Sequence, residues 1–203
     1  KILEKIQNNK KINIIFLDEN KGAGYCRNIG IEISNSDYIS FIDSDDTWET
    51  NKLKNQLSFM EKNEYDFTYT QYSTFSTKNG KNFFKTVNPP RKMSYETFIN
   101  DTSIATSSMI LKKKIIGETK FPDTKICEDY FFKCKILKIC NAYCLDDFLT
   151  KYRIRKNSLQ SSSLKNFYWI WKINKKYNKL NFFKNMTSLI SISFSSLKKY
   201  GFK

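Results

Sequence analysis

Apolar runs alternate with amphipathic segments in the first part of the chain. INIIFL (residues 12–17) and DYISFI (37–42) are short, continuous apolar runs, as expected of strands buried on both faces. Between them, AGYCRNIGIEIS places apolar residues three or four positions apart, which is typical of a helix. Strand, helix and strand in this order predict a βαβ unit with a parallel sheet.

The remaining pattern predicts a mixed, less regular arrangement of short elements. In chain order, these are a helix burying Leu53, Leu57 and Met60; an antiparallel or edge strand, YDFTYTQYSTF; an Asn-Gly hairpin turn into NFFKTV; a short helix, SYETFIN; a strand at 106–111; a helix at 128–140 burying Phe132, Ile136 and Cys140; and a closing strand, AYCLDDFLTKYRI.

Three carboxylates follow the second apolar run directly, in YISFIDSDDTW. Asp43, Asp45 and Asp46 repel one another when all are ionised, unless a cation is present. Mg²⁺ and Mn²⁺ prefer such oxygen ligands, and Mg²⁺ completes its shell with substrate phosphates and water. The alternative is a solvated turn in which Asp46 caps a helix around Trp48–Glu61.

Three further segments carry groups suited to a diphosphate and to a nucleophile. ENKGAGYCRNIGI supplies a loop with an arginine and an asparagine, CEDYFF supplies adjacent acids, and KYRIRKNSLQSS supplies cations and hydroxyls. Backbone amides and cations bind phosphate, and a carboxylate accepts a proton. Taken alone, the pair Glu128 and Asp129 is equally typical of a helix N-terminus.

Composition narrows the chemistry. The 203 residues, a single-domain length, include five cysteines and no histidine. The odd cysteine count without a CxxC pair indicates reduced thiols in a cytoplasmic setting. The absence of histidine excludes Ser-His and Cys-His nucleophiles, so a general base would be a carboxylate, Lys or Tyr.

Four segments, in this order, resemble those of family 2 glycosyltransferases with the GT-A fold, inverting bacterial enzymes that use nucleotide-sugars. NKGAGYCRNIGI is similar to an N-x-G-x-x-x-x-R-N-x-G segment, FIDSDDTW to a D-x-D motif, EDYFF to E-D-x-x-F, and YRIRKNSLQSS to Y-R-x-H-x-x-S. The resemblance implies an α/β, GT-A-like fold with a mostly parallel nucleotide-binding sheet flanked by helices. A smaller, mixed acceptor-side region would complete it.

The resemblance also implies roles for individual residues. Asp129 would be the base that deprotonates the acceptor hydroxyl, with Glu128 beside it. Asp45 would hold a divalent cation, Mn²⁺ or Mg²⁺, on the diphosphate, and Asp43 would lie near the ribose and the metal. The donor-binding residues would be Asn20, Gly22, Arg27, Asn28, Asp43, Ser44, Asp45, Arg153 and Arg155.

Two departures from the family pattern affect these expectations. The family's first strands, including a D-D-G-S-like turn that reads the base, have no counterpart after Lys1. Residues 1–163 are therefore expected to be an N-terminally truncated GT-A domain that exposes apolar strand edges. Arg155 stands where many members carry a metal-facing histidine, and arginine pairs with phosphate but does not bind a metal.

The C-terminal segment differs from the rest of the chain in charge. Residues 164–203 contain nine lysines and no acidic residue, which leaves +6 of the net charge of +15 for residues 1–163. This basic, aromatic tail is expected to be helical. Three hypotheses stay open for it: a solvated face packed on the domain, contact with an anionic membrane surface, and nucleic-acid binding.

The sequence therefore predicts a hexosyl- or N-acetylhexosaminyltransferase of cell-surface polysaccharide synthesis. Its donor would be a nucleotide-sugar, with a UDP-sugar favoured, and its acceptor a glycan or a lipid-linked molecule. It would be cytoplasmic or peripheral on the inner face of the cytoplasmic membrane. The alternatives are a catalytically inactive relative, a basic nucleic-acid-binding protein and a nucleotidyl transferase.

Overall fold

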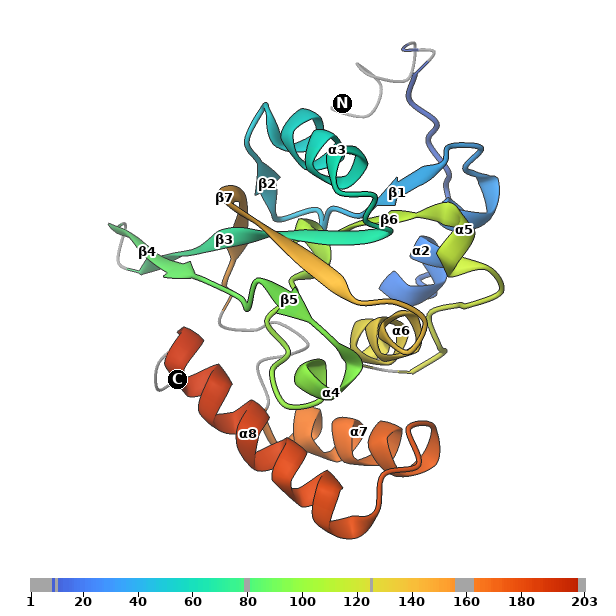
Figure 1. The fold of residues 1–203 in the computed structure, drawn as a ribbon. Coiled ribbons are helices and arrows are strands. Elements are labelled where there is room, and N and C mark those ends of the chain that lie inside the picture. Colours follow the sequence, from blue (N-terminus) through green and yellow to red (C-terminus); the bar gives the residue numbers. More distant parts are fainter. Residues whose placement is uncertain (1–8, 10, 79–80, 125, 156–162, 201–203) are drawn as a thin grey trace.

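A curled sheet runs through the molecule, with helices on both sides (Figure 1). This computed structural model describes residues 9, 11–78, 81–124, 126–155 and 163–200. The elements, labelled as in Figure 1, are α2 Ala23–Ile33, β1 Tyr38–Ser40, β2 Thr47–Trp48, α3 Lys52–Lys62, β3 Phe67–Lys78, β4 Lys81–Val87, β5 Lys92–Met93, α4 Tyr95–Phe98, the 3₁₀ helix η1 Thr106–Ser108, β6 Ile110–Lys112, α5 Lys113–Ile116, α6 Glu128–Leu137, β7 Ala142–Arg153, α7 Ser163–Lys176 and α8 Phe182–Tyr200.

The sheet contains one parallel pairing among the described strands. Its order is β1-β6-β3-β7-β2, with β4 added to β3 and β5 to β7. β3 and β7 run parallel, and the other five pairings are antiparallel. The α/β class is confirmed, but the prediction of a mostly parallel sheet is wrong. A hairpin follows β3 and β6 returns between β1 and β3, whereas parallel neighbours need a crossover connection.

The predicted first strand is absent. Residues 12–17 have no strand structure, and Phe16 is 70% exposed. A run of β-branched residues becomes a strand only where a neighbour accepts its backbone hydrogen bonds. No described strand pairs with this segment, so the predicted βαβ unit does not form. The preceding segment, KILEKIQNNKK, has the pattern of the second half of an amphipathic helix, and it falls mainly on residues outside those described.

Strand β3 lies in the centre of the sheet and is buried on both faces. Phe67 and Tyr69 belong to the main hydrophobic core, on the side of α4 and α6. Thr68 and Thr70 are also fully buried, and Thr68 Oγ1 accepts a hydrogen bond of 3.1 Å from Gln56 Nε2 of α3. The alternating pattern therefore predicted a strand correctly, but it is not an edge strand.

Helix α3 packs through a face that its sequence pattern did not predict. Met60 is buried, but Leu53 is 44% exposed, and Lys52 and Gln56 are buried instead. Lys52 Nζ donates to Gln56 Oε1 at 2.9 Å and lies 4.2 Å from the centre of the Trp48 ring. Burial lowers the pKa of Lys52 to about 7. The polar network with Gln56 and Trp48 compensates for placing an amine against the sheet.

The segment predicted as a strand at 106–111 begins as a 3₁₀ turn. Only Ile110–Lys112 forms β6, and Thr106–Ser108 forms η1. The hydroxyl of Ser108 donates to the carbonyl of Ala105 at 2.7 Å, which satisfies a buried polar group locally in place of a strand partner. This turn brings two buried hydroxyl residues, Thr106 and Ser107, to the carboxyl end of β1.

Other predicted elements are confirmed. Helix α2 and strand β7 form as expected, and α6 ends three residues before the predicted boundary. Strands β3 and β4 pair as a hairpin up to Lys78 and Lys81, with the Asn-Gly turn itself outside the described residues. Within the described chain, no helix combines the length and hydrophobicity that crossing a membrane requires.

The C-terminal helices α7 and α8 pack on the rest of the fold. Ile170, Ile173 and Ile192 join the same core as the residues of β3 and α6. The hydroxyl of Tyr130 also donates to Asn174 Oδ1 of α7 at 2.7 Å. The helical tail is thus confirmed, while a domain boundary at residue 163 stays a prediction.

Candidate functional site

The turn into α2 forms one side of a small cavity. Gly22 has a φ of +84°, which favours glycine, and its N–H donates to Asn20 Oδ1 at 2.9 Å. The first N–H groups of the helix point towards this loop, and the cap residue, Gly22, has no side chain to accept a hydrogen bond from them. The cavity, of about 240 Å³, is lined by residues of this turn and of 121–128, including Tyr25, Asn28 and Glu128.

Asn28 bonds to Phe121, in the segment that forms the opposite wall of this cavity. Its amide donates to the carbonyl of Phe121 at 2.9 Å and accepts from the N–H of Phe121 at 2.8 Å. This paired contact joins α2 to the loop before α6. Asn28 lines the cavity, but its side-chain amide is bonded to the backbone of Phe121. Its role in donor binding stays a prediction.

Arg27 connects two groups of carboxylates that are far apart in sequence. Its guanidinium donates to Asp43 Oδ1 at 2.6 Å and to Glu128 Oε1 at 3.0 Å, and lies 5.4 Å from the centre of the Phe121 ring. Burial would lower the pKa of Arg27, but nearby carboxylates, led by Asp43 and Asp129, outweigh it and raise that pKa. Arg27 thus stays cationic between acids that would otherwise repel one another.

The carboxylates at residues 43–46 point in separate directions. Asp43 pairs with Arg27, and Asp45 pairs with Arg155 Nε at 2.9 Å. Arg153 Nε donates to the carbonyl of Asp45 at 3.1 Å. The two predicted arginines of β7 and its following residues therefore lie beside Asp45. Ser44 is exposed between these carboxylates.

Asp46 is a buried anchor of this loop, and its predicted role as a helix cap is wrong. Helix α3 begins only at Lys52, with Asn51 at the cap position. Asp46 Oδ2 accepts from the hydroxyl of Ser107 at 2.6 Å, and Asp46 Oδ1 accepts from the N–H of Arg153 at 2.9 Å. Burial raises the pKa of Asp46 to about 6, although both hydrogen bonds favour the ionised form.

Replacing Ser107 by Ala is expected to destabilise this loop. The Ser107 hydroxyl donates to Asp46 and accepts from the N–H of Asp43 at 3.0 Å, so its loss leaves two polar groups unpaired. We expect Ser107→Ala to lower the free energy of unfolding by about 1–3 kcal/mol in urea denaturation. Ser36→Ala, at an exposed position, is the matched control. An equal effect of both substitutions would contradict the anchoring role.

The start of α6 carries the second group of carboxylates. Cys127, which precedes the helix, has a left-handed φ of +62°, and Glu128 and Asp129 form the first turn. Asp129 Oδ2 accepts from Lys133 Nζ at 2.8 Å and from the hydroxyl of Thr106 at 3.3 Å. The sharp turn therefore directs both acids towards α2 and η1.

The two acids of α6 have opposite pKa shifts. Burial, reinforced by the neighbouring charge of Asp129, raises the pKa of Glu128, and the ion pair with Arg27 only partly offsets this. Burial would also raise the pKa of Asp129, but the ammonium of Lys133 and the guanidinium of Arg27 outweigh it and hold that pKa at about 2. Asp129 is thus an ionised carboxylate at neutral pH.

The described side chains do not assemble a ready metal centre. No group of three or more Asp, Glu, Cys or His side chains in this part of the chain could hold a metal ion. Asp43 and Asp45 offer suitable oxygen ligands, but each is paired with an arginine. Mg²⁺ characteristically uses only one or two carboxylates together with substrate phosphates. The donor set therefore fits a metal that arrives with a diphosphate.

Three residues that the sequence analysis missed support the predicted ones: Thr106, Ser107 and Lys133. The run TSS before β6 lies in the segment predicted as a strand, although successive hydroxyl residues also suit a turn that hydrogen-bonds its surroundings. Lys133 follows Asp129 by four positions, the spacing of a helical ion pair. That spacing is a signal that could have identified it.

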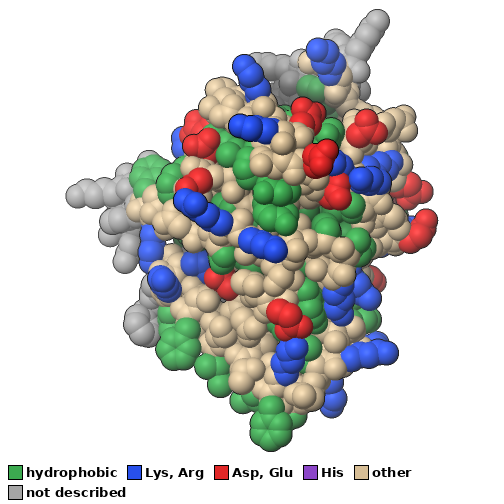
Figure 2. Space-filling view, in the orientation of Figure 1, with side chains coloured by type: hydrophobic (Ala, Val, Ile, Leu, Met, Phe, Trp, Pro, Cys, Tyr) green, Lys and Arg blue, Asp and Glu red, His purple; other side chains and the backbone are tan. Residues whose placement is uncertain are grey.

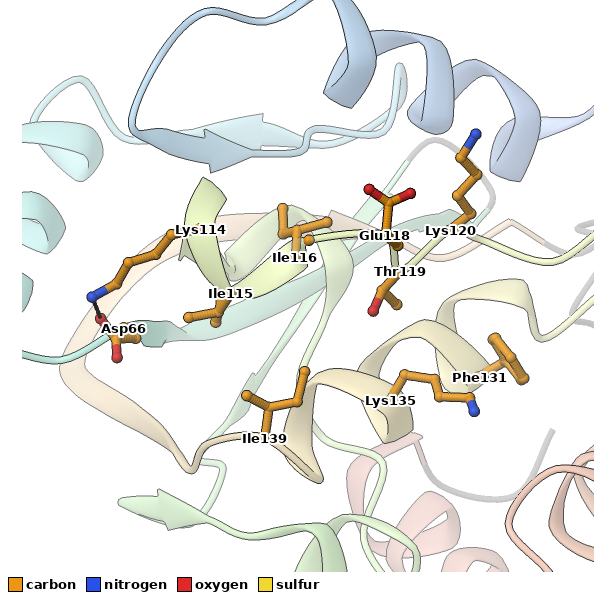
Figure 3. A pocket seen from close by; sticks show the side chains of 11 residues that line it. Asp66, Lys114, Ile115, Ile116, Glu118, Thr119, Lys120, Phe131, Lys135 and Ile139 are labelled. Atoms are coloured by element: carbon orange, nitrogen blue, oxygen red, sulfur yellow. Dashed lines mark ion pairs between the residues drawn. The ribbon is translucent and has the colours of Figure 1, made fainter.

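A second, larger cavity lies away from these residues. It has a volume of about 740 Å³ and opens beside α5 and the later turns of α6, as Figure 3 shows. Lys114 pairs with Asp66 at one end, at 3.3 Å, and Phe131 and Lys135 line the other end. None of the predicted site residues lines this cavity, so the candidate site is the one around Arg27.

Several curated proteins are similar in sequence to this chain over most of its length. It is 28% identical over 191 residues to a putative teichuronic acid biosynthesis glycosyltransferase of Bacillus subtilis, covering 94% of this chain and 75% of that protein. It is 31% identical over 200 residues to an uncharacterized glycosyltransferase of Haemophilus influenzae, covering 96% of this chain and 78% of that protein. An Escherichia coli UDP-Glc:α-D-GlcNAc-diphosphoundecaprenol β-1,3-glucosyltransferase, WfgD, is 28% identical, over 80% of this chain and 64% of its own.

Solved structures confirm the GT-A-like fold. The crystal structure of S. aureus TarS in complex with UDP-GlcNAc superposes with a TM-score of 0.68 and 19% identity. The match covers 97% of this chain and 59% of that one. The family described as Glycosyl transferase family 2 matches residues 1–119, more than half of the chain. The chain therefore belongs to glycosyl transferase family 2.

Proposed function

We propose that this protein transfers a sugar from a UDP-sugar to a lipid-linked or glycan acceptor in cell-surface polysaccharide synthesis. One observation carries the proposal: Arg27 bonds to Asp43 of the 43–46 loop and to Glu128 of α6, which brings these two acidic segments to one place. Sugar transfer needs a cationic region for the leaving diphosphate and, close to it, a carboxylate for the acceptor proton. The relatives include a putative teichuronic acid biosynthesis glycosyltransferase and a diphosphoundecaprenol glucosyltransferase, and these names support this class of substrate.

In this proposal, Asp129 is the general base. Its carboxylate is ionised, and it lies at the start of α6 beside Glu128, which bonds to Arg27. Attack by the acceptor oxygen opposite the departing diphosphate inverts the anomeric centre, and Asp129 takes the proton released from that oxygen. Lys133 and Thr106 are positioning residues that orient the carboxylate through Oδ2.

The donor diphosphate would be bound by cations near Asp45. Arg153 and Arg155 already contact this residue, and both can form paired hydrogen bonds with phosphate. Gly22 and Asn28 line the cavity at the turn into α2. Asn20 bonds to Gly22, and Arg27 bonds to Glu128, which also lines this cavity. A Mn²⁺ or Mg²⁺ ion, held by Asp45 with Asp43 beside it, would offset charge on the leaving group. Binding of that ion requires Arg155 to leave Asp45 for the phosphates.

Asp45→Asn should weaken metal-dependent donor binding. The substitution keeps the shape of the side chain but removes the charge that holds the metal and pairs with Arg155. We expect UDP affinity, measured by calorimetry with Mn²⁺, to fall by about tenfold or more, since a lost charged ligand weakens the metal and the diphosphate together. Without metal, the variant should bind UDP about as well as the wild type. A variant with unchanged Mn²⁺ dependence would remove Asp45 from the metal site.

The activity itself is tested with defined substrates. The protein is incubated with UDP-glucose or UDP-GlcNAc and a lipid-linked GlcNAc-diphosphate acceptor, and the product is followed by chromatography with nuclear magnetic resonance for the anomeric configuration. We expect UDP release that depends on the acceptor and a product of inverted configuration. Binding of oligonucleotides without any sugar transfer would instead favour a nucleic-acid-binding protein.

The proposal places the protein in the cytoplasm, at the inner face of the cytoplasmic membrane. Nucleotide-sugars are cytoplasmic substrates in this view, and a lipid-linked acceptor presents its sugar at the membrane surface. The basic segment 164–203, with its nine lysines, is the part of the chain suited to contact anionic lipid.

A further inference from the structure

Helix α8 presents a continuous apolar stripe to solvent. Phe183, Met186, Ile190, Phe194 and Leu197 follow one another at spacings of three or four residues, so they share one face of the helix. All five are exposed, Phe183 to 80% and Phe194 to 70%. Figure 2 shows hydrophobic side chains along the lower left edge of the molecule, where α8 runs in Figure 1.

The opposite face of α8 fixes this orientation. Asn185, Ser188 and Ile192 are buried. Asn185 Oδ1 accepts from Asn174 Nδ2 of α7 at 3.1 Å, and the hydroxyl of Ser188 donates to the carbonyl of Ile99. The helix therefore turns Asn185 and Ser188 inwards, where each has a partner, and leaves the five apolar residues of the stripe outside. Exposing this stripe to water is unfavourable. A contiguous exposed apolar surface of this kind usually marks an interaction site.

The charge around the stripe indicates what covers it. The lysines at 172, 175, 176, 179, 184 and 198 are exposed on α7, α8 and the turn between them, and no acidic residue lies in 164–203. Two copies docked through this face would bring these like charges together, which disfavours self-association. A nucleic acid would match the charge but would leave the apolar stripe in water. An anionic bilayer matches both features, because its interface accepts apolar and aromatic side chains beneath a layer of phosphates.

We propose that α8 lies flat in the interface of an anionic bilayer. The stripe from Phe183 to Leu197 enters the boundary between headgroups and acyl chains, and the lysines of α7 and α8 contact lipid phosphates. With 19 residues the helix is about 28 Å long, enough to bind as an interfacial helix. This deepens the proposed function, on which it rests for its purpose: it would bring the site to the surface that holds a lipid-linked acceptor.

Vesicle flotation of the purified protein tests whether the stripe of α8 binds lipid, and it needs no sugar donor or acceptor. We expect the wild type to bind phosphatidylglycerol vesicles and to bind phosphatidylcholine vesicles much more weakly. Phe183→Ser combined with Phe194→Ser should lower partitioning onto phosphatidylglycerol by about tenfold or more, because two exposed aromatic rings no longer enter the interface. Phe16→Ser, at a 70% exposed position of the 12–17 segment, is the matched control and should bind as the wild type does.

The lysines give an independent measurement. Lys175→Gln combined with Lys176→Gln should also reduce binding by about tenfold, and raised salt should reduce wild-type binding, since each basic residue near the surface contributes to the attraction. Melting temperatures of all variants should match the wild type, because the substituted side chains are exposed.

Three outcomes would overturn the inference: no binding of the wild type to phosphatidylglycerol vesicles, equal binding by the double phenylalanine variant, or a wild-type dimer in light scattering that this variant abolishes. The last would assign the stripe to a second copy of the chain. Vesicle binding requires no sugar transfer, so these results are distinct from a failure of the proposed activity.

Discussion

Asp129→Asn is expected to lower sugar transfer by roughly 10²–10⁴-fold, the usual contribution of general acid–base catalysis. Asparagine keeps the size of the side chain and can still bond to Thr106, but it cannot accept the acceptor's proton. Donor binding should survive, because the predicted donor contacts lie around Arg27 and Asp45, and Asp129 does not line the cavity at the turn into α2. Turnover is measured with a competent acceptor beside UDP affinity by calorimetry.

Glu128→Gln separates the two acids of α6. Glu128 pairs with Arg27, and burial together with the neighbouring charge of Asp129 raises its pKa, which makes it a stronger base than a free carboxylate. We expect a smaller loss of turnover in Glu128→Gln than in Asp129→Asn, if Glu128 only positions its neighbours. Near-wild-type turnover in Asp129→Asn, together with a large loss in Glu128→Gln, would transfer the role of base to Glu128. A thermal melt of each variant excludes loss of the fold as the cause.

Local patterns in the sequence predicted the elements that depend on local contacts. Helices α2 and α6 have apolar residues at helical spacing, and β3 and β7 are long enough to be recognised without knowing their neighbours. The run at 12–17 is equally apolar, yet it is not a strand here, because strand formation needs a partner that the described chain does not provide. The prediction of a mostly parallel sheet was wrong for a related reason, because the relative direction of neighbouring strands depends on how distant segments pair.

The motifs of the site can be recognised in the sequence, but the hydrogen bonds between them cannot. Sequence resemblance identified Arg27, Asp43 and Glu128 separately, and the structure joins them in one hydrogen-bonded group. Ser107 was not identified because it lies 61 positions from Asp46, its partner, in a segment taken as strand. A polar group that is held by such a distant partner leaves no periodic signal in its own neighbourhood.

Lys133→Met is expected to destabilise the fold by about 3–5 kcal/mol, the usual cost of removing one partner of a buried ion pair. Lys133 is 2% exposed, and its ammonium donates to Asp129 Oδ2 and to the carbonyl of Ile104, each at 2.8 Å. Methionine fills a similar volume but leaves the largely buried carboxylate of Asp129 without its ammonium partner. Urea denaturation at pH 7 measures the loss.

The same variant should show a distinct pH dependence. In the wild type, the pKa of Asp129 is about 2 and lies below its unfolded value, so its contribution is present at neutral pH and is lost as the pH falls from about 4 towards 2. In Lys133→Met, burial should raise that pKa above the unfolded value, so folding takes up a proton and the variant gains stability as the pH falls towards 4. The stability gap between the two proteins should therefore be smaller at pH 4 than at pH 7.

A double substitution decides whether this cost belongs to the ion pair. Asp129→Asn combined with Lys133→Met removes both charges, so no uncompensated carboxylate stays buried, and its cost should be well below the sum of the two single costs. Costs that simply add would mean that Lys133 stabilises the fold by packing and by its bond to Ile104, independently of Asp129. In that case the low pKa of Asp129 would need another cation, and the guanidinium of Arg27, which also lowers that pKa, would supply it.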